Sequence, residues 1–549
     1  MILACTAFTA CSQQTDARKQ DGEHLFEGQI APLLEGMSDY HYKISTDDTL
    51  AQDFFNQGLM LSYGFNHKEA NRSFRQVAKL DSNNPMAWWG AALVLGPNIN
   101  AAMPEDNIPR AWEALQKAQK LQANGTQKEQ DFIEALSYRY AKNPPEDRTS
   151  LDSAYSAAMG QLAEKYSNDL DVQTLYAESI MDLHPWNYWK ENGEPQPWTP
   201  ELLSTLESVI ERDPDHPGAN HLYIHATEAE QPEKALPSAN RLRKMVPGAG
   251  HLVHMPSHIY IRTGDYHEGT LANERAVKAD NEYVTQCRQQ GIYPLAYVPH
   301  NYHFLWATAT MEGRAKRSIE AAKSTSDLVD TETMREPDLG TLQHYWVIPL
   351  YGYVRFAKWD EIIEYPEPAE DLIYPRGVWH YARGMAQVGN GDIEKATAEL
   401  EKLQAIAADD TLQEVTIWDI NTTQELMQIA YRVLEGEIEA QEENYDKAIG
   451  LLKEAVEIED RLSYNEPPDW FFPVRHNLGS VLLKADRPAE AENIYRQDLA
   501  KFPDNGWSLY GLWQSLKAQG KTDEATKMKQ QFEKAWQYAD VKLKASRMM

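Results

Sequence analysis

The residues of this chain most able to carry chemistry are histidines, and they are concentrated in one part of it. The chain has 16 histidines in 549 residues. Ten of them fall between His184 and His303, a 120-residue window in which even spacing would place about 3.5. Imidazole binds Zn, Cu, Fe and Ni, and histidines one helical turn apart can reach a single ion. The concentration therefore predicts a transition-metal site, with Cu and Zn considered first.

The spacing of these histidines indicates which of them share a face. In the stretch from Gly250 to Arg262, three histidines follow one another at steps of three and four, as residues on one side of a helix do. Shorter pairs stand before and after this stretch. The candidate metal ligands are His221, His225, His251, His254, His258, His300 and His303. The candidates for supporting those imidazoles are His184, Glu178, Asp182, Glu228, Arg262 and His344.

Pro256 lies within the central stretch and allows two local structures. Inside a helix it would remove the hydrogen bond to Leu252 and kink the chain. At the first turn of a helix it would leave His251 and His254 on the incoming loop.

Two other interpretations of the histidines remain. They could be half-buried side chains that pack helix against helix, or donors to an anionic or peptide ligand. The chain has no His-Glu-x-x-His and no Cys-x-x-Cys, so the usual metallohydrolase and haem-attachment signatures are absent. The segment Gly520-Lys521-Thr522 lacks the earlier glycine of a phosphate loop, and no nucleotide cofactor is expected. Whether the chain catalyses a reaction stays open.

The elements that would position the histidines are helices in pairs. Ala51 to Leu80 contains small and aromatic residues at helical spacing around the turn Gly64-Phe65-Asn66-His67, and the next such unit opens at Pro85, about 34 residues later. Similar turns occur at Gly264, Glu442, Arg487 and Gly520. This pattern resembles the tetratricopeptide repeat. The resemblance implies an all-α, right-handed superhelical solenoid of about a dozen helix pairs. First helices are expected near Phe54, Trp88, Phe132, Leu175, His221, His254, His303, Tyr345, Trp379, Leu426, His476 and Leu509.

The resemblance also implies a common location for the histidines, because first helices of this repeat family line a concave groove. Three segments do not fit the repeat: 183–200, which is rich in Trp and Pro, 283–299, and 465–473. We expect the last to close one end of the groove or to act as a structural plug. The expected domains are 1–11 (signal remnant), 12–47 (tether), 48–200, 201–400 (His-rich) and 401–549.

The net charge limits the kinds of partner that the chain can bind, and the N-terminal sequence indicates where in the cell it is located. The net charge of −30, with no basic stripe, argues against nucleic acid. Phe8-Thr9-Ala10-Cys11 is similar to a bacterial lipoprotein cleavage box, with Cys11 as the lipidated residue, although no basic residue precedes it. We therefore expect a lipid anchor as the sole membrane attachment, a natural start codon upstream, and a location in the bacterial cell envelope, as a periplasmic or outer-membrane lipoprotein. A disordered cytoplasmic N-terminus is the alternative.

These observations lead to one functional hypothesis and its rivals. Ala249–Tyr260 and Pro299–Leu305 resemble a group of His-rich, lipoprotein-like bacterial tetratricopeptide proteins, a likeness that implies no activity. The first hypothesis is a solenoid that binds Cu or Zn, as a metal carrier or a metal-dependent oxidoreductase. The second is a scaffold that holds a protein or peptide and no metal. Glycan binding is a third, indicated only by the Trp-rich segment. The oligomeric state stays open.

Overall fold

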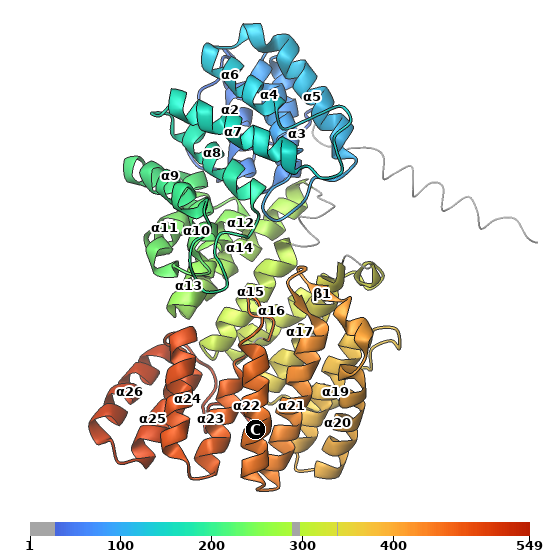
Figure 1. Cartoon of the computed structure of the whole chain (residues 1–549), viewed down its shortest axis with the longest axis vertical. Helices are drawn as coiled ribbons and strands as arrows, with labels where there is room; N and C mark the ends of the chain where they lie inside the picture. Colours follow the sequence, from blue (N-terminus) through green and yellow to red (C-terminus); the bar gives the residue numbers. More distant parts are fainter. Residues whose placement is uncertain (1–27, 288–296, 337–338, 471) are drawn as a thin grey trace, which may run out of the picture. The chain divides into compact units, whose positions relative to one another are not determined.

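The computed structural model of the chain describes residues 28–287, 297–336, 339–470 and 472–549 (Figure 1). Regular structure in these ranges is almost entirely helical. The strands described are β1 (Thr416–Ile417) and β2 (Asn421–Thr422), which form a short antiparallel ribbon pairing Thr416 with Thr422. Within the described residues, no helix combines the length and the apolar character that crossing a bilayer requires.

The chain divides into two compact units. Unit 1 comprises Met1–Ala226, Lys244–Leu252 and Glu282–Arg288, and unit 2 comprises Thr227–Arg243, Val253–Asn281 and Gln289–Met549. Unit 1 contains α2 (Thr49–Tyr63), α3 (His67–Leu80), α4 (Pro85–Leu93), α5 (Asn107–Leu121), η1 (Gln122–Asn124), α6 (Gln127–Ser137), α7 (Thr149–Lys165), α8 (Leu170–Leu183), α9 (Thr199–Arg212) and most of α10 (Pro217–Thr227).

Unit 2 holds the later helices. These are most of α11 (Pro232–Met245), then α13 (Pro256–Thr263), α15 (Val298–Met311), α16 (Ala315–Asp327), η3 (Thr333–Arg335), α17 (Gly340–Arg355), α18 (Trp359–Ile363), α19 (Ile373–Gly389), α20 (Ile393–Ala407), η5 (Asp410–Gln413), α21 (Thr423–Gln441), α22 (Tyr445–Glu459), α23 (Val474–Lys484), α24 (Pro488–Lys501), α25 (Gly506–Ala518) and α26 (Thr522–Ala535). Two helices, α12 (Gly250–His254) and α14 (Tyr266–Cys287), contribute residues to both units.

The all-α fold class is confirmed. Each position predicted for a first helix lies in a helix, from Phe54 in α2 to Leu509 in α25. Consecutive helices pack against one another within each unit, as α2, α3 and α4 do in unit 1 and α19, α20 and α21 do in unit 2 (Figure 1). The sequential stacking of helix pairs is that of a tetratricopeptide-like fold.

Glycines allow the helices of a pair to approach closely. The ring of Phe74 on α3 lies where side chains at Gly58 on α2 and Gly90 on α4 would project. A Cβ added at Gly58 or Gly90 would come within 2.7 or 2.5 Å of a ring carbon of Phe74. Such distances are far shorter than carbon–carbon contacts in packed cores. The small residues that the sequence pattern places on the first helices are therefore required by packing.

This packing gives a prediction with a matched control. Gly90→Ala should destabilise the protein by about 1–3 kcal/mol, because overpacking at Phe74 outweighs the better helix propensity of alanine. Gly450→Ala, on the exposed face of α22, meets nothing within 4 Å and should stabilise by about 0.5–1 kcal/mol. Urea unfolding of the two variants measures both changes. Destabilisation by both would show that the loss at Gly90 is not caused by Phe74.

The turns between paired helices share a left-handed residue at their centre. Its positive φ lets the chain reverse within a few residues and suits glycine best. The position is occupied by Gly264, Gly313, Gly391 and Gly520, and elsewhere by Phe65, Ala357, Glu443 and Asp486. The last glycine confirms that Gly520-Lys521-Thr522 is an inter-helix turn. Phe65, with φ 54°, is the bulky exception in this series.

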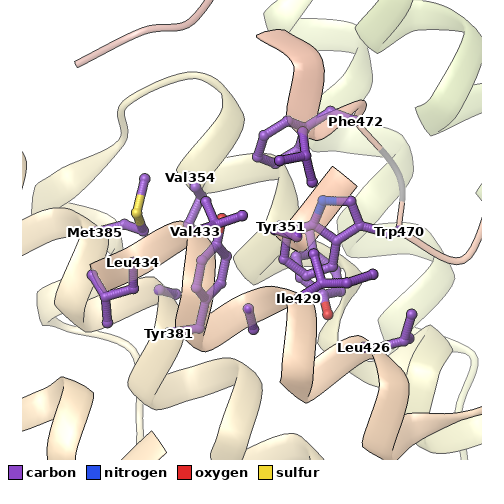
Figure 2. Close-up of a cluster of buried hydrophobic side chains, with 14 of the residues drawn as sticks. Tyr351, Val354, Tyr381, Met385, Leu426, Ile429, Val433, Leu434, Trp470 and Phe472 are labelled. Carbon is purple, nitrogen blue, oxygen red and sulfur yellow. The ribbon is translucent and has the colours of Figure 1, made fainter. Parts of the chain in front are cut away.

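Segment 464–473 covers the first helices of unit 2. It runs between α22 and α23, and its Trp470 ring lies 5.7 Å from Tyr351 on α17 and 5.4 Å from Tyr381 on α19. Figure 2 shows Trp470 beside Tyr351 and beside Ile429 of α21, and the Phe472 ring lies 6.0 Å from that of Trp470. Trp470 and Phe472 are both buried. Of the two roles considered for residues 465–473, the burial of Trp470 and Phe472 favours the structural plug.

The other predicted irregularities differ in outcome. Residues 184–198 form the expected insertion, with one isolated bridge between Trp189 and Pro195. The insertion expected at 283–299 begins later than predicted, because α14 continues to Cys287, and 288–296 lie outside the described residues. Pro256 opens α13 at its first position, but His251 and His254 lie in the short helix α12 rather than on a loop. The lipobox-like Cys11 also lies outside the described residues.

Candidate metal centres

The candidate ligands gather in two places, one in each unit. His221, His225 and His251 belong to unit 1 and form what we call the first centre. His254, His258 and His300 belong to unit 2 and form the second centre. In each centre the three imidazoles offer nitrogens within 4.8 Å of one another. All of these histidines are buried except His300, which is half-buried.

In the first centre, the last residue of α2, Tyr63, holds the imidazole of His221 through its backbone carbonyl. α10 places His221 and His225 one turn apart, and α12 supplies His251. The Nδ1–H of His221 donates to the carbonyl of Tyr63 at 2.5 Å. Because a carbonyl only accepts, the proton of neutral His221 is on Nδ1, and its Nε2 carries the lone pair. That Nε2 lies 3.2 Å from Nε2 of His251.

The second centre is built from α12, α13 and α15, and two of its imidazoles have hydrogen-bonding or charged partners on Nδ1. Nε2 of His254 on α12 lies 3.0 Å from Nε2 of His258 on α13, and α15 supplies His300. The Nδ1–H of His254 donates to Oδ1 of Asn273 at 2.6 Å. The amide nitrogen of Asn273 donates to the carbonyl of Gly269, which orients its oxygen toward His254. The proton of neutral His254 is therefore also on Nδ1.

Two carboxylates face the other side of His258. Its Nδ1 lies 3.2 Å from Oε2 of Glu228 and 2.9 Å from Oε2 of Glu466, and all three side chains are buried. Burial alone would lower the pKa of His258, but the two carboxylates raise it to about 10. Arg262 approaches the other oxygen of Glu466 at 3.9 Å. His258, Glu228 and Glu466 also have the spacing of a cation site on the Nδ1 side of the ring.

Aromatic residues enclose the two centres in the same way. The ring of Phe65 lies 4.7, 5.9 and 5.6 Å from those of His221, His225 and His251. The ring of Phe304 lies 4.7, 4.4 and 4.9 Å from those of His254, His258 and His300. Each centre also borders an exposed tryptophan with positive φ: Trp186, 5.2 Å from His225, and Trp418, 6.3 Å from His300. Each site thus has an apolar wall and one aromatic residue at the surface.

The nitrogen separations suit a metal with tetrahedral geometry. Two nitrogens bound to one ion at about 2.0–2.1 Å and a tetrahedral angle lie about 3.3 Å apart. The Nε2 pairs at 3.2 and 3.0 Å are close to that value. Hydrogen-bonded imidazoles have similar separations. The argument for an ion therefore rests on the third histidine in each centre and on the acceptors that hold Nδ1. Three imidazoles leave a fourth position for water or a substrate.

His303 and His344 lie together but outside both centres. Their rings are 5.5 Å apart, and Nδ1 of His344 lies 2.7 Å from the hydroxyl of Tyr374. Burial lowers the pKa of both, that of His344 to about 3. Among the described residues they belong to no group of three ligands. The pair lies in the core of unit 2, between α15 and α17.

The remaining supporting candidates of unit 1 contact other partners. His184 ends α8 and stacks on Trp198 with ring centroids 3.6 Å apart. Asp182 pairs with Arg139 at 2.7 Å, and burial together with the neighbouring Asp182 raises the pKa of Glu178. None of these three belongs to a ligand group in the described part of the chain. Of the supporting candidates, Glu228 and Arg262 are the ones beside a centre.

The buried imidazole of His344 gives a pH-dependent prediction. The unfolded chain binds a proton at His344 below pH about 6.5, whereas the folded protein does not until pH falls to about 3. The contribution of His344 to stability is therefore present above pH 6.5 and lost as the pH falls. Between pH 7 and 5, wild type should lose about 2 kcal/mol more than His344→Gln in urea unfolding. The variant His41→Gln, at an exposed position, should lose as much unfolding free energy as wild type over this pH range. If His344→Gln lost as much as wild type, His344 would not be the source of the pH dependence.

Several residues of the centres have no signal in the sequence. Glu466 lies 208 positions from His258, since 466 − 258 = 208, and nothing local links them. In the sequence, Asn273 looks like any other polar residue of a helix. The carbonyl of Tyr63 belongs to the backbone, which every residue type has, so the sequence cannot single it out. From the sequence alone, Phe65 and Phe304 are indistinguishable from ordinary hydrophobic core residues. A search for acidic residues inside segments that interrupt the repeat would have found Glu466.

Comparisons with known proteins identify no family for the chain. No protein-family model matches the chain, and no curated protein matches it. Solved structures similar to it include a human IFIT1 dimer with m7Gppp-AAAA (12% identity, 90% of this chain and 91% of that chain, TM-score 0.30). Others are Naa15/Naa10 bound to HypK-THB (12%, 88% and 70%, 0.23) and the APC/C hetero-tetramer Cut9-Hcn1 (13%, 89% and 94%, 0.28). These are helical-repeat proteins of the tetratricopeptide type. At these identities and TM-scores the likeness carries no argument about this chain.

Proposed function

We propose that the protein binds two transition-metal ions, Cu or Zn, one at each three-histidine centre of a tetratricopeptide-like scaffold. The observation that carries the proposal occurs twice. In each centre a third imidazole accompanies two Nε2 atoms that face each other, at 3.2 and 3.0 Å, and an acceptor holds Nδ1 on the opposite side of a ring. Metal-binding histidines typically have such a partner on the other nitrogen.

The chemistry of the ligands supports Zn and Cu over Mg and Ca. Neutral imidazole is a borderline ligand that suits both, whereas Mg and Ca require oxygen ligands. The open fourth position suits either delivery of the ion to a partner or reaction at the ion. The lipobox-like sequence at Cys11 supports the bacterial cell envelope as the place where this happens.

Metal titration tests the proposal directly. Elemental analysis of the native protein should find about two ions per chain. Zinc or copper at 100 times its dissociation constant should stabilise the metal-free protein by about 2.7 kcal/mol per site. A native protein without Cu or Zn that also fails to bind either ion would overturn the proposal.

The same experiment distinguishes metal binding from the alternative function, a peptide-binding scaffold without metal. That alternative predicts no bound ion and no stabilisation by Cu or Zn. Segment 464–473 argues against peptide binding on α17, α19 and α21, because Trp470 already covers Tyr351 and Tyr381. A peptide would have to displace this buried side chain.

A further inference from the structure

The two centres differ in the groups that hold their imidazoles. In the first centre the partner of His221 is a backbone carbonyl, that of Tyr63. In the second centre the partners of His258 are two buried carboxylates, Glu228 and Glu466. This difference has a direct chemical consequence, because a carboxylate withdraws the Nδ1 proton more strongly than a neutral amide does.

A carboxylate partner makes an imidazole a better metal ligand in two ways. It raises the electron density at the opposite nitrogen and fixes the orientation of the ring. It also supplies negative charge that compensates the positive charge of a buried ion. Two carboxylates and a divalent ion sum to zero charge. Arg262, at 3.9 Å from Glu466, offsets part of the negative charge without removing it.

Segment 464–473 holds Glu466 rigidly at His258. Trp470 and Phe472 anchor the segment in the core of unit 2 (Figure 2). Asp469 accepts hydrogen bonds from Asn421 at 2.7 Å and from Asn465 at 2.9 Å, which ties the segment to β2 and closes its own turn. The Glu466 carboxylate therefore meets His258 without a large loss of side-chain entropy.

We propose that Glu466, carried by this segment, is a positioning residue that makes the second centre the tighter of the two metal sites. The inference rests on the proposed function. It divides the two ions into one that the protein retains, in unit 2, and one that it exchanges, in unit 1. The exchanging ion is the one that a soluble chelator removes first.

Chelator competition on the full chain tests this division. Protein loaded with zinc should give up its ions in two steps whose affinities differ by about 10- to 100-fold, the usual effect of such a supporting carboxylate. Glu466→Gln should weaken the tighter step by about the same factor and leave the weaker one unchanged. His225→Ala should remove the weaker step alone. Glu457→Gln, at an exposed position on α22, is the matched control and should change neither step.

Cobalt spectroscopy distinguishes positioning from a general loss of folding. With Co²⁺ in place of zinc, Glu466→Gln should shift the visible absorption of the second centre while the metal-free variant unfolds at a similar urea concentration. Glu228→Gln should act in the same direction. Glu466→Asp, which keeps the charge, should recover part of the lost affinity. These readouts follow the ligand field at the ion, which global destabilisation alone would leave unchanged.

Each contrary result has its own meaning. Two equal affinities, or a tighter step unaffected by Glu466→Gln, would overturn the inference and leave the proposed function intact. Complete loss of one ion in Glu466→Gln, with none lost in His300→Ala, would place the ion between Glu228, His258 and Glu466 and would also overturn it. Absence of any zinc binding by wild type would overturn both proposals.

Discussion

Replacing His300 by alanine is expected to reduce the metal content of the protein from two ions per chain to one, and replacing His225 should do the same at the other centre. Losing one of a few ligands removes roughly 3 kcal/mol of binding free energy, a factor of about 100 in affinity. The double variant should bind no zinc in the range where wild type saturates.

The choice of these two histidines keeps the experiment interpretable. His258→Ala would leave Glu228 and Glu466 buried without their imidazole, so that lost metal and lost stability would be confounded. His184→Ala is a suitable control, because His184 stacks on Trp198 outside both centres. Inductively coupled plasma analysis after gel filtration gives the stoichiometry. A single variant that kept both ions would exclude that histidine from its centre.

Removing the indole of Trp470 is expected to have the largest effect on stability. Trp470 is 1% exposed and packs against Tyr351 and Tyr381, so Trp470→Ala should destabilise unit 2 by about 3–5 kcal/mol. Because the same segment carries Glu466, the variant should also bind zinc more weakly at the second centre, while the first centre keeps its affinity.

Trp418 provides the comparison for this variant. It belongs to the same unit but is 39% exposed, so Trp418→Ala should cost less than about 1 kcal/mol. Urea unfolding followed by circular dichroism measures both, with a separate transition fitted for each unit. A loss of less than 1 kcal/mol in Trp470→Ala would show that segment 464–473 is loosely held and would remove the structural basis for the role of Glu466.

Local pattern was enough to predict the helices and which histidines are near neighbours. Helix pairs follow from small residues at helical spacing and from turns such as Gly520-Lys521-Thr522, and these signals lie within about 34 residues. His254 and His258, one turn apart, were predicted to share a helix face, and their Nε2 atoms lie 3.0 Å apart. The exclusion of a phosphate loop at Gly520 follows from the same local reasoning.

Contacts between distant segments could not be predicted in this way. His303 repeats the spacing of the other histidine pairs, yet its ring lies beside that of His344. The sequence position of a residue on a helix does not tell which neighbouring helix its side chain will meet. Glu466 reaches His258 only because Trp470 and Phe472 fold segment 464–473 onto unit 2. Of the two structures considered for Pro256, the helix start at the proline is observed, but the loop expected to carry His251 and His254 is the short helix α12. Selecting between them requires the surrounding packing.

The left-handed residues beside the centres show where this scaffold gives up stability. Phe65, Trp186 and Trp418 each hold a positive φ that costs a residue with a side chain about 1–3 kcal/mol, and each ring borders a histidine of a centre. At the turn position equivalent to that of Phe65, Gly264, Gly313, Gly391 and Gly520 avoid that cost. Selection for stability alone would replace these rings with glycine. Their presence marks the turns and insertions, rather than the helices, as the parts of this fold where new binding sites can be introduced without repacking the repeat.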